Sequence, residues 1–223
     1  MNLIERAFWS HDEADRAKRF ANNKQLKAAI EIANKVISSW SDNPGFLERQ
    51  TRKLSIDNLL SDLKKKVKYW ETQVQKAEHL AQQAEQALAN NNSDPWDTTK
   101  LERAIYLYDQ SLSLMDNLDC KSNKVICQTK LQQKHEFQQY FKEGKEKSNK
   151  RYYKKGLEKF FKAQFLFITK TLSKEIINCR ENLFYEKQYE KAYNQAKQLT
   201  KKGDFQNAIT HFKPTYNSFP RQD

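Results

Sequence analysis

Glycine and proline are scarce in this chain of 223 residues, which contains four of each. Tight turns depend on these two residue types, so the chain has few turns and long regular elements between them. Valine, a favoured strand residue, also occurs only four times. These shortages argue against a β-sandwich, a β-barrel and an α/β sheet, and they predict an all-α protein.

The residue patterns of common catalytic and cofactor sites are missing as well. No Cys-x-x-Cys or His-x-x-x-His pair occurs in the sequence, so no metal site is predicted. Each of the four glycines stands alone, which excludes a glycine-rich phosphate loop. There is also no Gly-x-Ser-x-Gly nucleophile turn. The sequence therefore predicts a non-enzymatic protein without a cofactor.

Long apolar runs are absent too. No run approaches the roughly 18 residues that a membrane span needs, so we expect no membrane insertion. Charged residues interrupt the first 20 residues, where a signal peptide would carry its apolar segment. Cys120, Cys127 and Cys179 are odd in number and far apart, which is typical of reduced thiols. We expect a cytoplasmic protein.

Helix signals fill most of the chain. Ser10 with Glu13 and Thr99 with Glu102 form capping boxes, which mark expected helix starts. A short connection is expected at 116–122. The helices predicted from capping and apolar spacing run over 12–22, 24–39, 100–114, 123–150, 152–168 and 173–202.

The longest helical signal is a heptad seam within residues 46–89. Its apolar residues are spaced alternately by four and three: Ile56, Leu60, Leu63, Val67, Trp70, Val74, Ala77, Ala81, Ala84 and Leu88. Two interpretations follow. The helix packs against its neighbours in the same chain, or it forms a coiled coil with a second molecule. Alanine at the later positions favours packing within the chain.

The C-terminal residues predict one more short helix. Gly203 is placed to end the long helix in the left-handed conformation, and Asp204 is placed to cap the next helix. Pro214 lacks a backbone N–H and clashes with the preceding turn. We therefore expect this last helix to kink or stop near Phe212.

A spacing pattern recurs along the chain. Small residues and larger apolar residues follow one another at intervals of nine, three and four: Ala196, Phe205, Ala208 and Phe212; Gly144, Tyr153, Gly156 and Phe160; Ala17, Leu26, Ala29 and Ala33. A fourth copy, Leu101, Ala104 and Tyr108, follows its small residue Ala84 at a longer interval. The pattern resembles the tetratricopeptide repeat, a helix-turn-helix unit of about 34 residues.

The resemblance implies an α-solenoid of antiparallel helix hairpins with two unusually long helices, at 46–89 and 173–202. It would form a single elongated domain over 1–223, with hairpins at about 10–40, 56–115, 123–168 and 173–219. The pattern also predicts that Ala196, Ala208 and Gly156 are buried where helices cross.

Positive charge is concentrated in one segment of this basic chain, whose formal net charge is +12. Residues 142–174 contain eleven basic and three acidic residues, with aromatic residues between them. Basic and aromatic residues together are typical of single-stranded nucleic-acid binding. The alternative is that the periodic aromatic residues are core and the lysines form a solvated face.

Two trios of Lys and Asn are predicted to border one groove. Each trio is spaced by three and four, so its members share a helix face: Lys142, Lys145 and Asn149; Asn194, Lys197 and Lys201. Lys and Asn line the equivalent face in tetratricopeptide proteins that recognise a terminal carboxylate, so the resemblance implies a basic groove. The last hairpin is expected to leave an apolar surface partly exposed at Phe212, Tyr216 and Phe219.

These features predict a scaffold or adaptor whose groove binds an acidic or extended segment of a protein partner. The alternative is an accessory protein that binds nucleic acid or another anionic surface through residues 142–174. A further alternative is that a second copy of the same chain covers the apolar end, which gives a homodimer.

Overall fold

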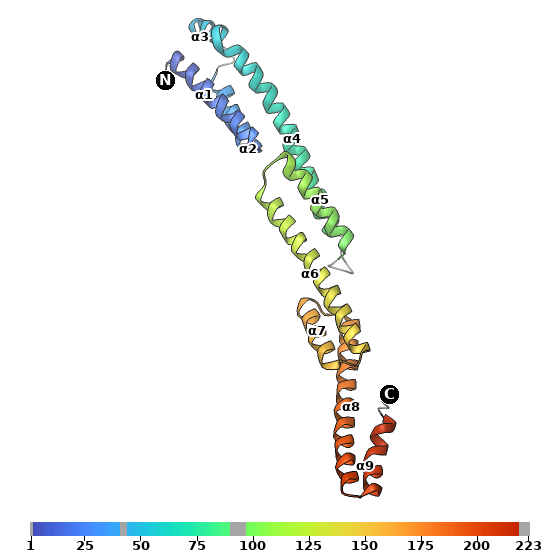
Figure 1. Ribbon diagram of the computed structural model, residues 1–223. Helices are drawn as coiled ribbons and strands as arrows, with labels where there is room; N and C mark the ends of the chain where they lie inside the picture. The colour runs from blue at the N-terminus through green and yellow to red at the C-terminus, as the bar shows by residue number, and fades with distance from the viewer. Residues whose placement is uncertain (1, 41–43, 90–96, 219–223) are drawn as a thin grey trace. The chain divides into compact units, whose positions relative to one another are not determined.

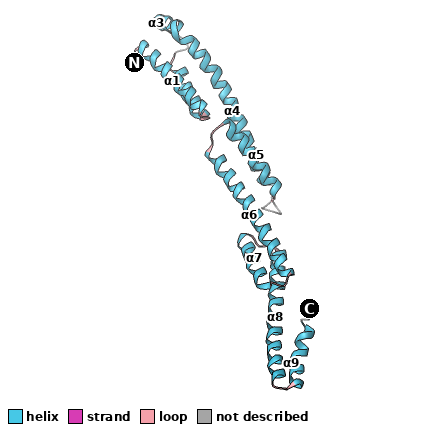
Figure 2. Ribbon diagram, in the orientation of Figure 1, coloured by secondary structure: helices cyan, strands magenta, loops and turns pink. Residues whose placement is uncertain are grey.

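The computed structural model describes residues 2–40, 44–89 and 97–218, and within these ranges all regular structure is helical (Figure 2). The predicted all-α class is confirmed. The described contacts divide the chain into two compact units, residues 1–131 and 132–223, where the sequence predicts a single domain. The boundary falls inside one long helix, α6.

The first unit contains the helices coloured blue to green-yellow in Figure 1. They are α1 (Leu3–Asn22), α2 (Leu26–Ser38), α3 (Phe46–Thr51), the π-helical turn η1 (Arg52–Ile56), α4 (Asp57–Ala89), α5 (Thr98–Leu114) and the start of α6 (Leu118–Asn149). The second unit contains the rest of α6 with α7 (Tyr153–Leu166), α8 (Lys170–Lys201) and α9 (Phe205–Ser218). With α6 at 32 residues, three described helices exceed 30 residues, whereas the sequence predicts two long ones.

The heptad seam of α4 packs against helices of its own chain. Its first part lies in one core with α1 and α2, which includes Leu60, Leu63 and Trp70. Its last part lies in a second core with α5 and the start of α6, which includes Ala84 and Tyr108. The intramolecular interpretation of the seam is confirmed, because the apolar face is used within the chain.

The first helix starts earlier than its predicted capping box. Asn2 caps α1, with its side chain accepting a hydrogen bond from the Glu5 backbone and Glu5 reaching back to the Asn2 backbone. Ser10 is instead buried inside the helix, where its hydroxyl donates to Arg6 O and accepts from Trp40 Nε1. The prediction was wrong because a distant tryptophan uses the hydroxyl.

Other helix starts also differ from the prediction, among them those of α5 and α6. Asp97, and not Thr99, caps α5, by accepting from the backbone N–H of Lys100. Asn117 Oδ1 accepts from the N–H groups of Asp119 and Cys120. The expected connection at 116–122 is therefore mostly helix, because this side chain satisfies the first free donors of α6.

Four antiparallel helix pairs organise the chain: α1 with α2, α4 with α5, α6 with α7, and α8 with α9. At the α6–α7 crossing, a Cβ on Gly144 would lie 2.5 Å from the Phe160 ring. A Cβ on Gly156 would lie 3.2 Å from Gly144 O. The predicted burial of Gly156 at a helix crossing is therefore confirmed, and a Cβ on Gly144 would require the Phe160 ring to move.

Three of these hairpins turn in the same way. Lys24, Arg151 and Gly203 each have a positive φ, at 61°, 60° and 80°. In each turn the next residue donates its N–H to a carbonyl five residues earlier: Gln25 to Phe20, Tyr152 to Lys147, and Asp204 to Leu199. This is the Schellman arrangement that ends helices. The expected left-handed end at Gly203 and the Asp204 cap are confirmed.

The last helix differs from its prediction at Pro214. Helix α9 runs past this proline to Ser218, so it does not stop near Phe212. Pro214 is the tenth residue of α9, where it cannot donate a backbone hydrogen bond to the carbonyl of Thr210. A kink at this position stays a prediction. The side chains of residues 215–218 lie outside the described part of the structure, as do residues 219–223.

Candidate functional site

The predicted trio on α6 lies at the surface. Lys142, Lys145 and Asn149 are all exposed. Lys145 is engaged within the fold, because its Nζ lies 3.4 Å from Glu175 Oε1 on α8 and 5.7 Å from the centre of the Phe141 ring. This lysine therefore helps to hold α8 against α6.

The second trio lies on α8 and is also exposed. Lys197 and Lys201 line an open groove between α8 and α9, whereas Asn194 is not among the lining residues. Lys197 Nζ lies 6.0 Å from the centre of the Tyr193 ring. Neither lysine forms an ion pair with any residue that the structure describes.

Measured along α8, the two trios lie far apart, and the first trio does not line the groove between α8 and α9. Lys145 contacts α8 at Glu175, and Lys197 lies 22 residues farther along this uninterrupted helix. At a rise of 1.5 Å per residue, this separation is about 33 Å. The described groove between α8 and α9 therefore includes members of the second trio alone, and one groove that borders both trios stays a prediction.

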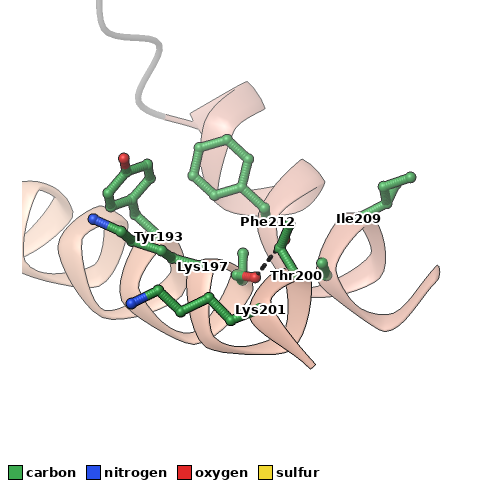
Figure 3. A pocket seen from close by; sticks show the side chains of 8 residues that line it. Tyr193, Lys197, Thr200, Lys201, Ile209 and Phe212 are labelled. Atoms are coloured by element: carbon green, nitrogen blue, oxygen red, sulfur yellow. Dashed lines mark hydrogen bonds between the residues drawn. The ribbon is translucent and has the colours of Figure 1, made fainter. Parts of the chain in front are cut away.

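The groove between α8 and α9 has a volume of about 510 Å³ and is mostly apolar (Figure 3). Its lining includes the small side chains of Ala196 and Ala208 and the larger apolar side chains of Tyr193, Phe212 and Ile209. Thr200 is turned back on its own helix and donates its hydroxyl to Ala196 O. The complete lining is Tyr193, Ala196, Lys197, Thr200, Lys201, Ala208, Ile209 and Phe212.

The groove leaves large apolar groups in contact with solvent. Tyr193 is 48% exposed and Ile209 is 58% exposed, while Ala208 is buried. Ala196 is only half-buried, so its predicted burial was wrong, because no described element covers the crossing from the groove side. Isolated exposed apolar residues are ordinary, but a contiguous set in a concave site indicates a binding surface.

Three aromatic rings support one wall of the groove. The Phe212 ring lies 5.4 Å from Tyr189 and 6.0 Å from Tyr193, edge to face in both cases. The two tyrosine rings are stacked at 6.3 Å. Phe212 is half-buried, as predicted for the terminal apolar surface. The Tyr216 side chain and Phe219, which complete that prediction, lie outside the described residues.

The groove carries positive charge. Residues 191–213 contain five lysines and a single acidic residue, Asp204. That carboxylate is occupied at the start of α9, where it accepts from the backbone N–H and the side-chain amide of Asn207. The rim is therefore suited to a partner with negative charge.

The aromatic residues of the basic segment 142–174 differ in burial, and Phe167 is half-buried. Tyr153 and Phe160 are core residues, as the structural alternative expected. Tyr152, Phe161 and Phe165 are exposed, with Phe165 at 92%. The Arg180 guanidinium lies 5.4 Å from the Phe161 ring.

The cysteines lie in the cores. Cys120, Cys127 and Cys179 are all buried and free. Burial raises the pKa of the Cys127 thiol and of the Cys179 thiol above the ordinary value. Both are therefore protonated at neutral pH, and a protonated thiol is a weak nucleophile. Within the described ranges, no three or more His, Cys, Asp or Glu side chains gather where they could hold a metal ion.

Sequence reasoning identified Lys197, Lys201 and Phe212 but missed Tyr193 and Ile209. The signal was present: Tyr189 and Tyr193 are one turn apart on α8, and Ile209 follows the small residue Ala208.

No described helix has an apolar stretch long enough to span a bilayer. No family model, no curated protein and no solved structure matches this chain.

Proposed function

We propose that this chain is a non-enzymatic scaffold or adaptor that binds a segment of a protein partner in the groove between α8 and α9. The observation that carries the proposal is an open apolar groove whose rim holds two lysines without ion pairs among the described residues. Apolar groups drive association, and the lysines select for acidic partners.

A repeat architecture supports this function. The small and aromatic positions of the recurring pattern are buried in the first three hairpins, and three hairpins share one turn geometry. We interpret the helix pairs as repeats of a tetratricopeptide-like solenoid, a class that commonly presents grooves to peptides. The groove lies in the fourth helix pair, α8 with α9, whose pattern residues are less buried than those of the first three pairs.

A second candidate is binding to nucleic acid or another anionic surface through residues 142–174. The observation that favours it is the net charge of +8 next to the exposed rings of Tyr152, Phe161 and Phe165. Such binding would weaken steeply as salt rises, because each phosphate contact releases counterions. Binding in the apolar groove would be less sensitive to salt.

Charge reversal separates the two candidates. Lys197→Glu with Lys201→Glu reverses the groove rim, and Lys154→Glu with Lys155→Glu makes the same charge change at exposed positions on α7. Affinity capture with mass spectrometry, with and without nuclease, is the measurement. We expect the groove variant to lose its protein partner and the α7 variant to keep it. Loss in the α7 variant alone, together with nuclease sensitivity, would instead favour the second candidate.

A further inference from the structure

The open groove has a covered counterpart in the same unit of the chain. Each lining residue of the α8–α9 groove has an equivalent 52 residues earlier in the α6–α7 hairpin: Phe141, Gly144, Lys145, Ser148, Asn149, Gly156, Leu157 and Phe160. The two hairpins therefore present the same arrangement of small residues, aromatic residues and lysine.

The equivalence extends to the geometry of the rings. Phe137 and Phe141 are stacked at 6.0 Å, as Tyr189 and Tyr193 are at 6.3 Å. The distance from Phe141 to Phe160 is 5.9 Å, and the equivalent distance from Tyr193 to Phe212 is 6.0 Å. Lysine lies over the matching ring in both hairpins, 5.7 Å from Phe141 and 6.0 Å from Tyr193.

In the α6–α7 hairpin, the first turns of α8 fill this groove. Leu172, Ile176 and Cys179 of α8 are buried in the core of that hairpin. The Cys179 thiol donates to Tyr153 O at 3.2 Å and lies 3.4 Å from a Cβ built on Gly156. Glu175, which lies between Leu172 and Ile176 on α8, pairs with Lys145. The occupant is thus an amphipathic helix with apolar residues at i, i+4 and i+7 and an acidic residue at i+3.

We infer that the α8–α9 groove binds an amphipathic helix of a partner protein, seated as α8 is seated on α6 and α7. This inference rests on the proposed function and names its ligand class. The partner helix carries apolar residues at i, i+4 and i+7, and its acidic residue at i+3 pairs with Lys197, the equivalent of Lys145. The recurring groove favours a helix over an extended segment, and Lys197, which has no ion pair among the described residues, favours the acidic residue at i+3.

The residues at the floor of the open groove limit the size of the partner side chain that packs against them. Ala196, Thr200 and Ala208 stand where the covered hairpin has Gly144, Ser148 and Gly156. Each replacement adds a methyl group, and the covered groove already holds Cys179 at close contact. The residue at i+7 of the partner helix is therefore small, such as alanine or serine. Lys201 replaces Asn149, which adds a second positive charge beside the helix.

A labelled synthetic peptide tests the inference on the full chain. The probe is a 15-residue helix, cross-linked on its solvent side, with Leu at i, Glu at i+3, Ile at i+4 and Ala at i+7. Fluorescence anisotropy measures its affinity. We expect binding that weakens at least about fivefold when Glu at i+3 becomes Lys. The Lys197→Glu variant should restore the affinity of this Lys peptide, and this reciprocal rescue is specific to the proposed pairing.

A second experiment blocks the floor of the groove and measures the affinity of the same peptide. Ala196→Leu places a larger side chain at the half-buried crossing and should abolish binding of the probe while circular dichroism shows unchanged helicity. Lys142→Glu, an exposed lysine on α6, is the matched control and should leave the affinity unchanged. Equal binding of a peptide with its apolar residues shifted by two positions, or unchanged binding to Ala196→Leu, would overturn the inference.

The remaining outcomes separate this inference from the proposed function. If an acidic peptide held extended by prolines binds better than the helix, and Lys197→Glu with Lys201→Glu abolishes that binding, the groove function stands and the helical ligand is wrong. If sedimentation shows a dimer that Ala196→Leu dissociates, the occupant is a second copy and the inference fails. If neither peptide binds and partner capture survives the double charge reversal, both proposals fail.

Discussion

The α6–α7 and α8–α9 hairpins follow the same residue pattern but differ in what covers them. In the first, Gly144, Gly156 and Phe160 are buried, and residues of α8 lie in the same core as Phe160. In the second, the equivalent Ala196 and Phe212 are only half-buried. Local sequence thus specifies the hairpin and its turn, whereas the helix that follows determines whether the groove becomes core or surface.

The largest contrast is expected for the paired phenylalanines. Phe160→Ala removes a fully buried ring and should lower the free energy of unfolding by about 3–5 kcal/mol. Phe212→Ala removes a half-buried ring and should cost about 1–2 kcal/mol, because less apolar area returns to water. Urea denaturation followed by circular dichroism measures both. Equal losses would mean that the α8–α9 groove is covered in solution.

The next largest difference in stability is expected when the small residue at each helix crossing is enlarged. Gly144→Leu forces its side chain into the Phe160 ring and should cost about 1–3 kcal/mol of stability. Ala196→Leu has the open groove to enter, so its stability should stay within about 0.5 kcal/mol of the parent. Thermal unfolding of both variants is the check. A large loss in Ala196→Leu would show that this crossing is as tight as the first.

Substitutions in the hairpin turns should change the free energy of unfolding by a smaller amount. Arg151 and Gly203 have the same left-handed conformation, which strains any residue with a Cβ. Arg151→Gly should therefore raise the free energy of unfolding by about 0.5–1 kcal/mol, despite the greater freedom of glycine in the unfolded chain. Gly203→Ala should lower it by about 1 kcal/mol. If the two changes shift stability in the same direction, the shared turn geometry is wrong.

The lysines should show the smallest effect. Lys145→Ala breaks the partly exposed pair with Glu175 and should cost about 0.2–1 kcal/mol, less at high salt. Lys197→Ala removes no ion pair with a described residue, so stability should not change measurably. Denaturation at low and high ionic strength tests both variants. A salt-dependent loss for Lys197→Ala would indicate that this lysine already has an acidic partner in the free protein.

Much of the architecture follows from local sequence. Scarce glycine and proline predict long helices, and the small residues at 144 and 156 predict where α6 and α7 cross. The left-handed end at Gly203 is also local, because glycine adopts that conformation without strain. Helix starts were less predictable: Ser10 matches a capping box, but the distant Trp40 indole uses its hydroxyl.

The candidate site required the tertiary structure. Sequence spacing identified Lys145 and Lys197 as equivalent lysines, since the same pattern surrounds both. Only the fold shows that Lys145 pairs with Glu175, whereas Lys197 borders an open groove. Periodicity determines which face of a helix is apolar, but not whether another element covers that face. That depends on long-range packing, and here α8 buries one hairpin in a core, whereas no described element covers the groove of the other.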